Sequence, residues 1–195
     1  MTNRAVAAAL MALPLAACGL NSVPTAEETA KARWADVQNE YQRRADLIPN
    51  LVATVKGYAK QESDVLTRVT EARANAGRIQ LSGDDLKDPA KVQQYANAQN
   101  GLSAALTQLR PLQEAYPDLK SNANFMALQS QLEGTENRIT IARRDYNGAV
   151  QDYNTRIRTF PDAVGAKIFY GAKPMVPFQA TTPNAQTAPT VNFGA

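Results

Sequence analysis

The stretch that decides the fold reads RRADLIPNLVATVKGYAKQE, from Arg43 to Glu62. Apolar residues recur in it every three or four positions, a spacing that predicts one face of an amphipathic helix. Pro49 lies inside this pattern, and a proline within a helix leaves the carbonyl of Ala45 without its usual backbone donor. The apolar register is the same on both sides of Pro49. The stretch therefore predicts one helix that is kinked at Pro49 and continues beyond it.

The same periodicity extends outward from this stretch over most of the chain. It predicts a first helix over residues 25–76, a second over 89–116 and a third over 125–160, and no stretch alternates as a strand would. The expected fold is all-α, an elongated antiparallel bundle of three long helices with coiled-coil-like seams and the first helix kinked at Pro49. Counting the kinked halves separately gives four helices.

Two short motifs predict where helices begin. Thr25 and Glu28 have the spacing of a capping box, in which the side chains of the two residues bond to each other's backbone amides. Asp88 followed by Pro89 combines a typical N-cap with the residue favoured at the first helical position. The sequence thus predicts helix starts at residues 25 and 89.

The composition excludes several kinds of activity. The 195 residues include no histidine and one cysteine, which removes histidine-based acid–base catalysis and nearly every transition-metal site. The 21 basic residues are interleaved with 18 acidic ones for a net charge of +3, so no basic stripe for nucleic acid is expected. We expect a protein that is not an enzyme, without catalytic residues, bound metal or cofactor.

The first eighteen residues, MTNRAVAAALMALPLAAC, have the form of a lipoprotein signal peptide. A basic residue precedes an apolar run that is too short to span a membrane, and residues 15–18, Leu-Ala-Ala-Cys, match the bacterial lipobox. This pattern predicts cleavage before Cys18 and attachment of acyl chains such as palmitate to it. Each buried methylene contributes about 0.8 kcal/mol, so several chains would form a durable anchor.

These patterns divide the chain into four parts. Residues 1–17 are the expected signal peptide, 18–24 a lipidated tether, 25–161 the helical bundle, and 162–195 a mixed segment followed by a disordered tail. Gly19 is not the aspartate that retains lipoproteins in the inner membrane. The expected location is therefore the cell envelope, at the outer membrane facing the periplasm if the source has two membranes.

Polar side chains at helical spacing are the best candidates for a site. They form a stripe on the last helix and a group around Pro49 on the first: Arg43, Arg44, Asp46, Asn50, Glu136, Asn137, Arg143, Asn147 and Asn154. Two interpretations remain open for them. They either form a hydrogen-bond network that fixes the register of the helices, or they form a site for a ligand or partner.

Several motifs in this order and spacing resemble those of the LemA family of bacterial membrane-associated helical proteins. They are Arg43–Val52, Val55–Ala59, Tyr116–Lys120, Leu132–Ile139, Ala142–Asn147 and Phe160–Pro161. The resemblance implies an extracytoplasmic antiparallel helical bundle and implies no reaction. The chain departs from the family's usual pattern in having a lipobox in place of a transmembrane helix, and Gln61 where a histidine is common.

The function that these features predict is that of a membrane-anchored, non-enzymatic scaffold or protein-interaction module. As partners we expect the membrane, through the acyl chains, and other envelope proteins, with homo-oligomers also compatible with such a rod. One alternative is a helical module that binds a lipid or a peptide. Another is a hydrolase that uses carboxylates, for which the candidates are Glu114, Asp118, Glu133 and Glu136.

Overall fold

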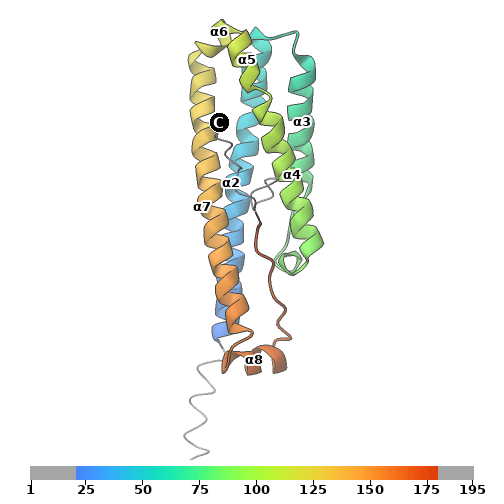
Figure 1. Cartoon of the computed structure of the whole chain (residues 1–195), viewed down its shortest axis with the longest axis vertical. Coiled ribbons are helices and arrows are strands. Elements are labelled where there is room, and N and C mark those ends of the chain that lie inside the picture. The colour runs from blue at the N-terminus through green and yellow to red at the C-terminus, as the bar shows by residue number, and fades with distance from the viewer. Residues whose placement is uncertain (1–20, 180–195) are drawn as a thin grey trace, which may run out of the picture.

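The computed structural model describes residues 21–179, which form helices joined by short turns, with no β-strand in that range. The helices are α2 (Ser22–Tyr58), α3 (Ser63–Arg78), the 3₁₀ turn η1 (Asp85–Lys87), α4 (Pro89–Thr107), α5 (Arg110–Ala115), α6 (Pro117–Lys120), α7 (Ala123–Arg156) and α8 (Asp162–Ile168). Figure 1 shows a rod in which α2 and α7 run antiparallel along its length. The pair α3 and α4 lies beside them over one half, α5 and α6 close that end, and α8 closes the other. The predicted all-α class is confirmed.

The helix α2 passes through Pro49 without interruption, as the apolar register predicts. The carbonyl of Ala45, which the proline leaves without its helical donor, accepts a hydrogen bond of 2.7 Å from Nε of Arg73 on α3. The neighbouring helix thus supplies the donor that Pro49 lacks. This bond also ties α3 to α2 at the level of the proline.

The structure differs from the expected first helix in where that helix divides. Instead of one kinked helix over 25–76, α2 ends at Tyr58, the chain reverses over Ala59–Glu62, and α3 runs back antiparallel to α2. Ala59 leaves the helical region at φ −121° and ψ 61°. The intervening turn is four residues long, close to one helical turn, so the three–four spacing of apolar residues continues across it. Periodicity alone therefore could not reveal the break.

The two predicted helix starts have opposite outcomes. Asp88 caps α4 as expected, since its Oδ1 accepts hydrogen bonds from the amides of Ala90 at 2.9 Å and Lys91 at 3.5 Å. The capping box at Thr25 is wrong, because α2 already begins at Ser22 and the Thr25 hydroxyl donates to the carbonyl of Asn21 inside the helix. The added turn buries Val23 in the core, which favours the earlier start.

The chain beyond Pro161, which the sequence analysis places outside the bundle, returns to it. After α8 the chain turns at Gly171, whose φ of 53° is readily available only to glycine. Residues 172–179, which we call the strap, then run in an extended conformation back along the rod between α2, α7 and α4 (Figure 1). Met175 and Phe178 of the strap are each 2% exposed. The residues after 179 lie outside the described part.

The rod contains two hydrophobic clusters along its axis. The cluster toward α8 joins α2, α4, α7 and the strap around Trp34, whose ring centroid lies 5.2 Å from those of Tyr95 and Tyr146 and 6.1 Å from that of Phe178. The second cluster, toward α5 and α6, is formed mainly by aliphatic residues of α2, α3, α4 and α7. No helix within residues 21–179 is long and apolar enough to cross a membrane.

We predict that the hydrogen bond from Arg73 to the carbonyl of Ala45 stabilises the fold because Pro49 cannot donate to that carbonyl. Arg73→Ala should lower the free energy of unfolding by about 1 kcal/mol, because it leaves a carbonyl without a partner. In a Pro49→Ala background the loss should be smaller, since residue 49 then has an amide that donates to Ala45. Urea denaturation of the four proteins of this cycle measures the coupling, and Arg68→Ala, an exposed arginine on α3, is the control. An equal loss in both backgrounds would contradict the account.

Candidate functional site

The side chain of Arg44 lies at the centre of the polar residues selected from the sequence. It is 1% exposed and projects from α2 between α4 and α7. Its NH1 donates to Oε1 of Glu136 at 2.6 Å and to the hydroxyl of Ser103 at 2.8 Å. Its NH2 donates to Oε1 of Gln99 at 2.8 Å, and the guanidinium lies 5.0 Å from the ring centroid of Tyr41. The buried charge is therefore paired with Glu136 and hydrogen-bonded through both terminal nitrogens, as burial of an ion requires, while Nε has no hydrogen-bond partner among the described residues.

This polar layer separates the two hydrophobic clusters. On α2 the first cluster ends at Tyr41 and the second begins at Ile48, with Arg44 between them. Gln99 occupies the corresponding place on α4 and Glu136 the corresponding place on α7. A polar layer of this kind can be satisfied in only one register of the three helices. The geometry therefore favours the register-fixing interpretation for Arg44 and Glu136.

The other candidates near Pro49 do not join this layer. Arg43, Asp46 and Asn50 are exposed on α2, and Oδ1 of Asp46 accepts a hydrogen bond from the side chain of Gln42 one turn away. Asn137 is likewise exposed, on α7. Of the residues selected on the first helix, only Arg44 contacts the selected residues of the last helix through a hydrogen bond that the structure describes.

The remaining candidates on α7 hold the strap. Asn154 accepts a hydrogen bond of 2.9 Å from the amide of Met175 and donates one of 2.8 Å to the same residue's carbonyl. Asn147 forms the same pair with Phe178, at 2.7 and 2.9 Å. Arg143 donates to the carbonyl of Gln179 at 3.2 Å and lies over the ring of Phe178. Each asparagine thus binds both backbone groups of one strap residue.

Two tyrosines beside these asparagines complete the attachment. The hydroxyl of Tyr153 donates to the carbonyl of Lys173 at 3.0 Å, and that of Tyr146 donates to the carbonyl of Val176 at 2.9 Å. Burial, the main cause, raises the pKa of Tyr153 to about 12 and raises that of Tyr146 as well. Both hydroxyls therefore keep their protons at neutral pH and remain donors.

The repeat on α7 matches a repeat on the strap. The tripeptide Asp-Tyr-Asn occurs at 145–147 and again at 152–154, seven residues apart, which is about 10.5 Å along a helix. The strap repeats a residue, a proline and an apolar residue at 173–175 and 176–178, and three extended residues span about 9 to 10 Å. Each Tyr-Asn pair therefore meets an equivalent unit of the strap.

The prolines of the strap fit this arrangement. Pro174 and Pro177 have no amide hydrogen. In the segment 174–178, therefore, only the amides of Met175, Val176 and Phe178 need acceptors. The amides of Met175 and Phe178 have the asparagines, and that of Val176 donates to the carbonyl of Leu86 in η1 at 2.8 Å. The amides of this segment thus all have acceptors while Met175 and Phe178 are buried.

Sequence reasoning selected the asparagines and the arginine but missed the strap. The helical spacing of Tyr146 and Tyr153 predicted only that they are core residues. The segment 173–178 was assigned to a mixed tail because an extended segment has no helical period. The signal that points to both is the pair of matched repeats described above.

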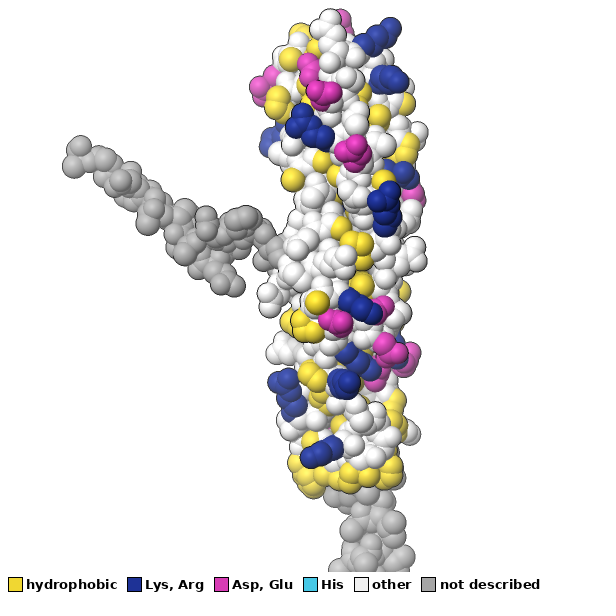
Figure 2. Space-filling view, turned by 90° about the vertical axis from the view of Figure 1, so that its right-hand side faces the viewer, with side chains coloured by type: hydrophobic (Ala, Val, Ile, Leu, Met, Phe, Trp, Pro, Cys, Tyr) yellow, Lys and Arg dark blue, Asp and Glu magenta, His cyan; other side chains and the backbone are white. Residues whose placement is uncertain are grey.

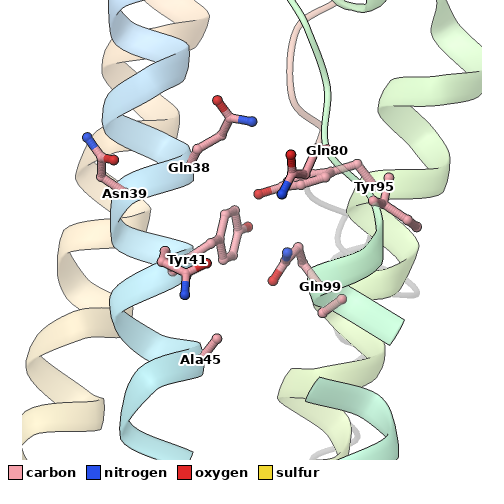
Figure 3. Close-up of a pocket in the computed structure, with 11 residues that line it drawn as sticks. Gln38, Asn39, Tyr41, Ala45, Gln80, Tyr95 and Gln99 are labelled. Carbon is pink, nitrogen blue, oxygen red and sulfur yellow. The ribbon is translucent and has the colours of Figure 1, made fainter. Parts of the chain in front are cut away.

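A shallow cavity of about 240 Å³ lies beside the Arg44 layer, between α2, α4 and the segment after α3. In Figure 3, Gln38 and Tyr41 of α2 face Gln80 and Gln99 across it. Its polar lining residues carry amide and hydroxyl groups, and none of the residues that line it is charged. Such a lining offers neither a nucleophile with its base nor a pair of carboxylates.

The described residues offer little to the hydrolase alternative. Within residues 21–179 no three acidic, histidine or cysteine side chains are placed to hold a metal ion. Of the four carboxylates considered for catalysis, Glu136 is already bound to Arg44. Cys18, the expected lipidation site, lies outside the described residues.

Comparison with known proteins identifies the family. The family model named LemA matches residues 33–193, which include most of α2, all of α3 to α8, and the strap. The chain belongs to the LemA family. The match extends past Pro161, so the strap falls within the region that the family model matches.

Three curated relatives of this LemA chain are distant. Magnetosome protein MamQ 2 of Paramagnetospirillum magneticum is 26% identical over 157 residues, which cover 72% of this chain and 58% of that protein. Magnetosome protein MamQ of Magnetospirillum gryphiswaldense shows the same identity and coverage. Protein LemA of Metamycoplasma hominis is 26% identical over 121 residues, 62% of this chain and 51% of that protein. The chain therefore spans little more than half the length of these relatives.

We predict that Asn147 and Asn154 protect the strap amides that they bind from hydrogen exchange. Asn147→Ala should speed hydrogen exchange at the amide of Phe178, and Asn154→Ala at that of Met175. Each substitution removes two hydrogen bonds worth about 1 kcal/mol apiece, so exchange should rise about tenfold or more. Exchange measured by NMR tests this, with Asn137→Ala, an exposed asparagine of the same helix, as the control. Unchanged protection of both strap amides would refute the assignment.

Proposed function

We propose that this LemA-family chain is a lipid-anchored, non-enzymatic protein of the cell envelope that acts as a scaffold for other proteins. The anchor is the acylated Cys18, and the location is the outer membrane facing the periplasm in a source with two membranes. The family's helical architecture supports a rod that holds partners at a distance from the membrane. The long α2 and α7 give it a length of about 50 Å at 1.5 Å per residue.

The proposal that the protein is not an enzyme is supported by the contacts that its polar side chains make. Arg44 and Glu136 bind each other within the layer between the clusters, and Asn147 and Asn154 bind the backbone of the strap. Acid–base chemistry requires titratable groups that converge on a cleft where a substrate fits. The polar groups of this rod instead converge on its own chain, which favours a structural and interaction role.

A second candidate function, a peptide-binding module, is favoured by one observation. The groove between α2, α4 and α7 already holds an extended segment with two prolines, and it does so largely through backbone hydrogen bonds. Recognition of this kind combines backbone contacts for affinity with pockets for alternate side chains, here those of Met175 and Phe178. A segment of another protein with the same pattern of proline and apolar residues would suit this groove.

The scaffold proposal is tested by acyl labelling combined with crosslinking in intact cells. The wild-type chain should incorporate an azide-tagged palmitate and fractionate with membranes. Mature Cys18→Ala protein should neither incorporate the palmitate nor fractionate with membranes. A photo-crosslinker at Ile141, which is 49% exposed on α7, should give discrete protein adducts in the wild type. The same position in Cys18→Ala, where the chain is not anchored, is the control. Labelling of Cys18→Ala, or adducts that are identical in the control, would count against the proposal.

A further inference from the structure

The end of the rod formed by α8 carries a concentration of exposed apolar side chains. Of the eight large hydrophobic residues that are exposed in the described part of the chain, five lie within residues 160–170. We call these five residues the apolar cap: Phe160, Val164, Ile168, Phe169 and Tyr170. Phe160 is 86% exposed, Ile168 69% and Phe169 66%. Figure 2 shows hydrophobic side chains gathered over this end and scattered elsewhere on the same face. A contiguous patch of this kind marks an interaction surface.

The sequence of α8 explains why the cap faces outward. Gly165 and Ala166 are buried, and because glycine has no side chain and alanine only a methyl group, the helix can lie close across the end of the rod. Val164 and Ile168, four residues apart, share the opposite face of the helix, with the exposed Lys167 between them in sequence. The larger apolar residues of this helix are therefore on the side away from the bundle.

The N-terminal end of α2 lies at this same end of the rod. The hydroxyl of Ser22 donates a hydrogen bond of 2.6 Å to Oδ2 of Asp162, the first residue of α8. Cys18 precedes Ser22 by four residues, which span at most about 14 Å when fully extended. Whatever its conformation, the tether therefore keeps the expected lipid anchor within a short distance of the apolar cap.

The charges around the cap have the sign that suits an anionic lipid surface. Arg158, Lys167 and Lys173 are exposed there. Asp162 is the one acidic residue in the sequence from 157 to 173, and its carboxylate accepts the hydrogen bond from Ser22. Basic side chains beside large apolar ones are typical of segments that lie in the membrane interface.

We propose that the apolar cap is a membrane-interface surface that inserts into the leaflet holding the acyl chains of Cys18. The cap enters the boundary between headgroups and acyl chains to a depth of about 5 to 10 Å, and the basic side chains contact anionic headgroups. The rod then stands on its α8 end, with α5 and α6 farthest from the membrane. This inference rests on the proposed acylation of Cys18 and adds a second, non-covalent contact that sets the orientation of the rod.

The test uses the acylated full-length chain in vesicles of phosphatidylethanolamine and phosphatidylglycerol. Because Cys18 is the single cysteine and is blocked by acylation, Ile168→Cys provides one reactive thiol for an NBD fluorophore. We expect blue-shifted emission and quenching by nitroxide-labelled lipids. Met126→Cys, an exposed apolar residue at the far end of the rod, is the matched control and should show neither. Adding Val164→Asp and Phe169→Asp to Ile168→Cys should return its emission to that of the control.

Three other outcomes overturn the inference. Ile168 labels that stay aqueous on vesicle-bound protein would show that the acyl chains anchor the rod without the cap. Labels quenched by a nitroxide on a second copy of the chain, but not by lipids, would assign the cap to a dimer. If Val164→Asp and Phe169→Asp left the NBD emission at position 168 unchanged, the tether alone would determine how deeply this end of the rod enters the membrane. Protein absent from the vesicle fraction would instead refute acylation at Cys18, so the two failures are distinguishable.

Discussion

The structure depends on the need to cover two long helices along their whole length. The helices α2 and α7 have 37 and 34 residues, whereas α3 and α4 have 16 and 19 and so cover only about half of the rod at 1.5 Å per residue. An amphipathic helix pair without a further layer would leave apolar side chains in water. The strap supplies that layer over part of the other half, where Met175 and Phe178 pack with the aromatic residues around Trp34.

Burying an extended segment creates a second requirement, because its backbone groups need partners. Neighbouring strands would supply them in a sheet, but this rod has helices whose backbone groups already bond to each other. The tyrosines and asparagines of α7 take that role, and the two prolines reduce the number of amides to be satisfied. The Arg44 layer fixes how α2, α4 and α7 align, and this alignment helps to form the groove in which the strap lies. The polar residues of the family motifs thus support both the register of the bundle and the attachment of the strap.

Apart from the start of α2, which was wrongly placed at Thr25, the sequence predicted features with a local cause and missed those that depend on long-range contacts. The helix through Pro49, the cap at Asp88 and the grouping of Asn147 with Asn154 follow from spacing and side-chain chemistry. The turn at Ala59–Glu62 was missed because its length preserves the apolar period. The partners of Arg44 on α4 could not be assigned, since they require knowing which helices are neighbours. The strap was missed because its burial is set by a groove that forms only when distant helices meet.

The central claim is that the strap is part of the hydrophobic core, and it can be tested by measuring unfolding in urea for two shortened chains. A chain ending after Gln179 should keep the free energy of unfolding of the full chain. A chain ending after Ala172 loses Met175 and Phe178, whose burial contributes about 1.5–3 kcal/mol each, and should be less stable by about 3–6 kcal/mol. Equal stability of the two shortened chains would contradict the account.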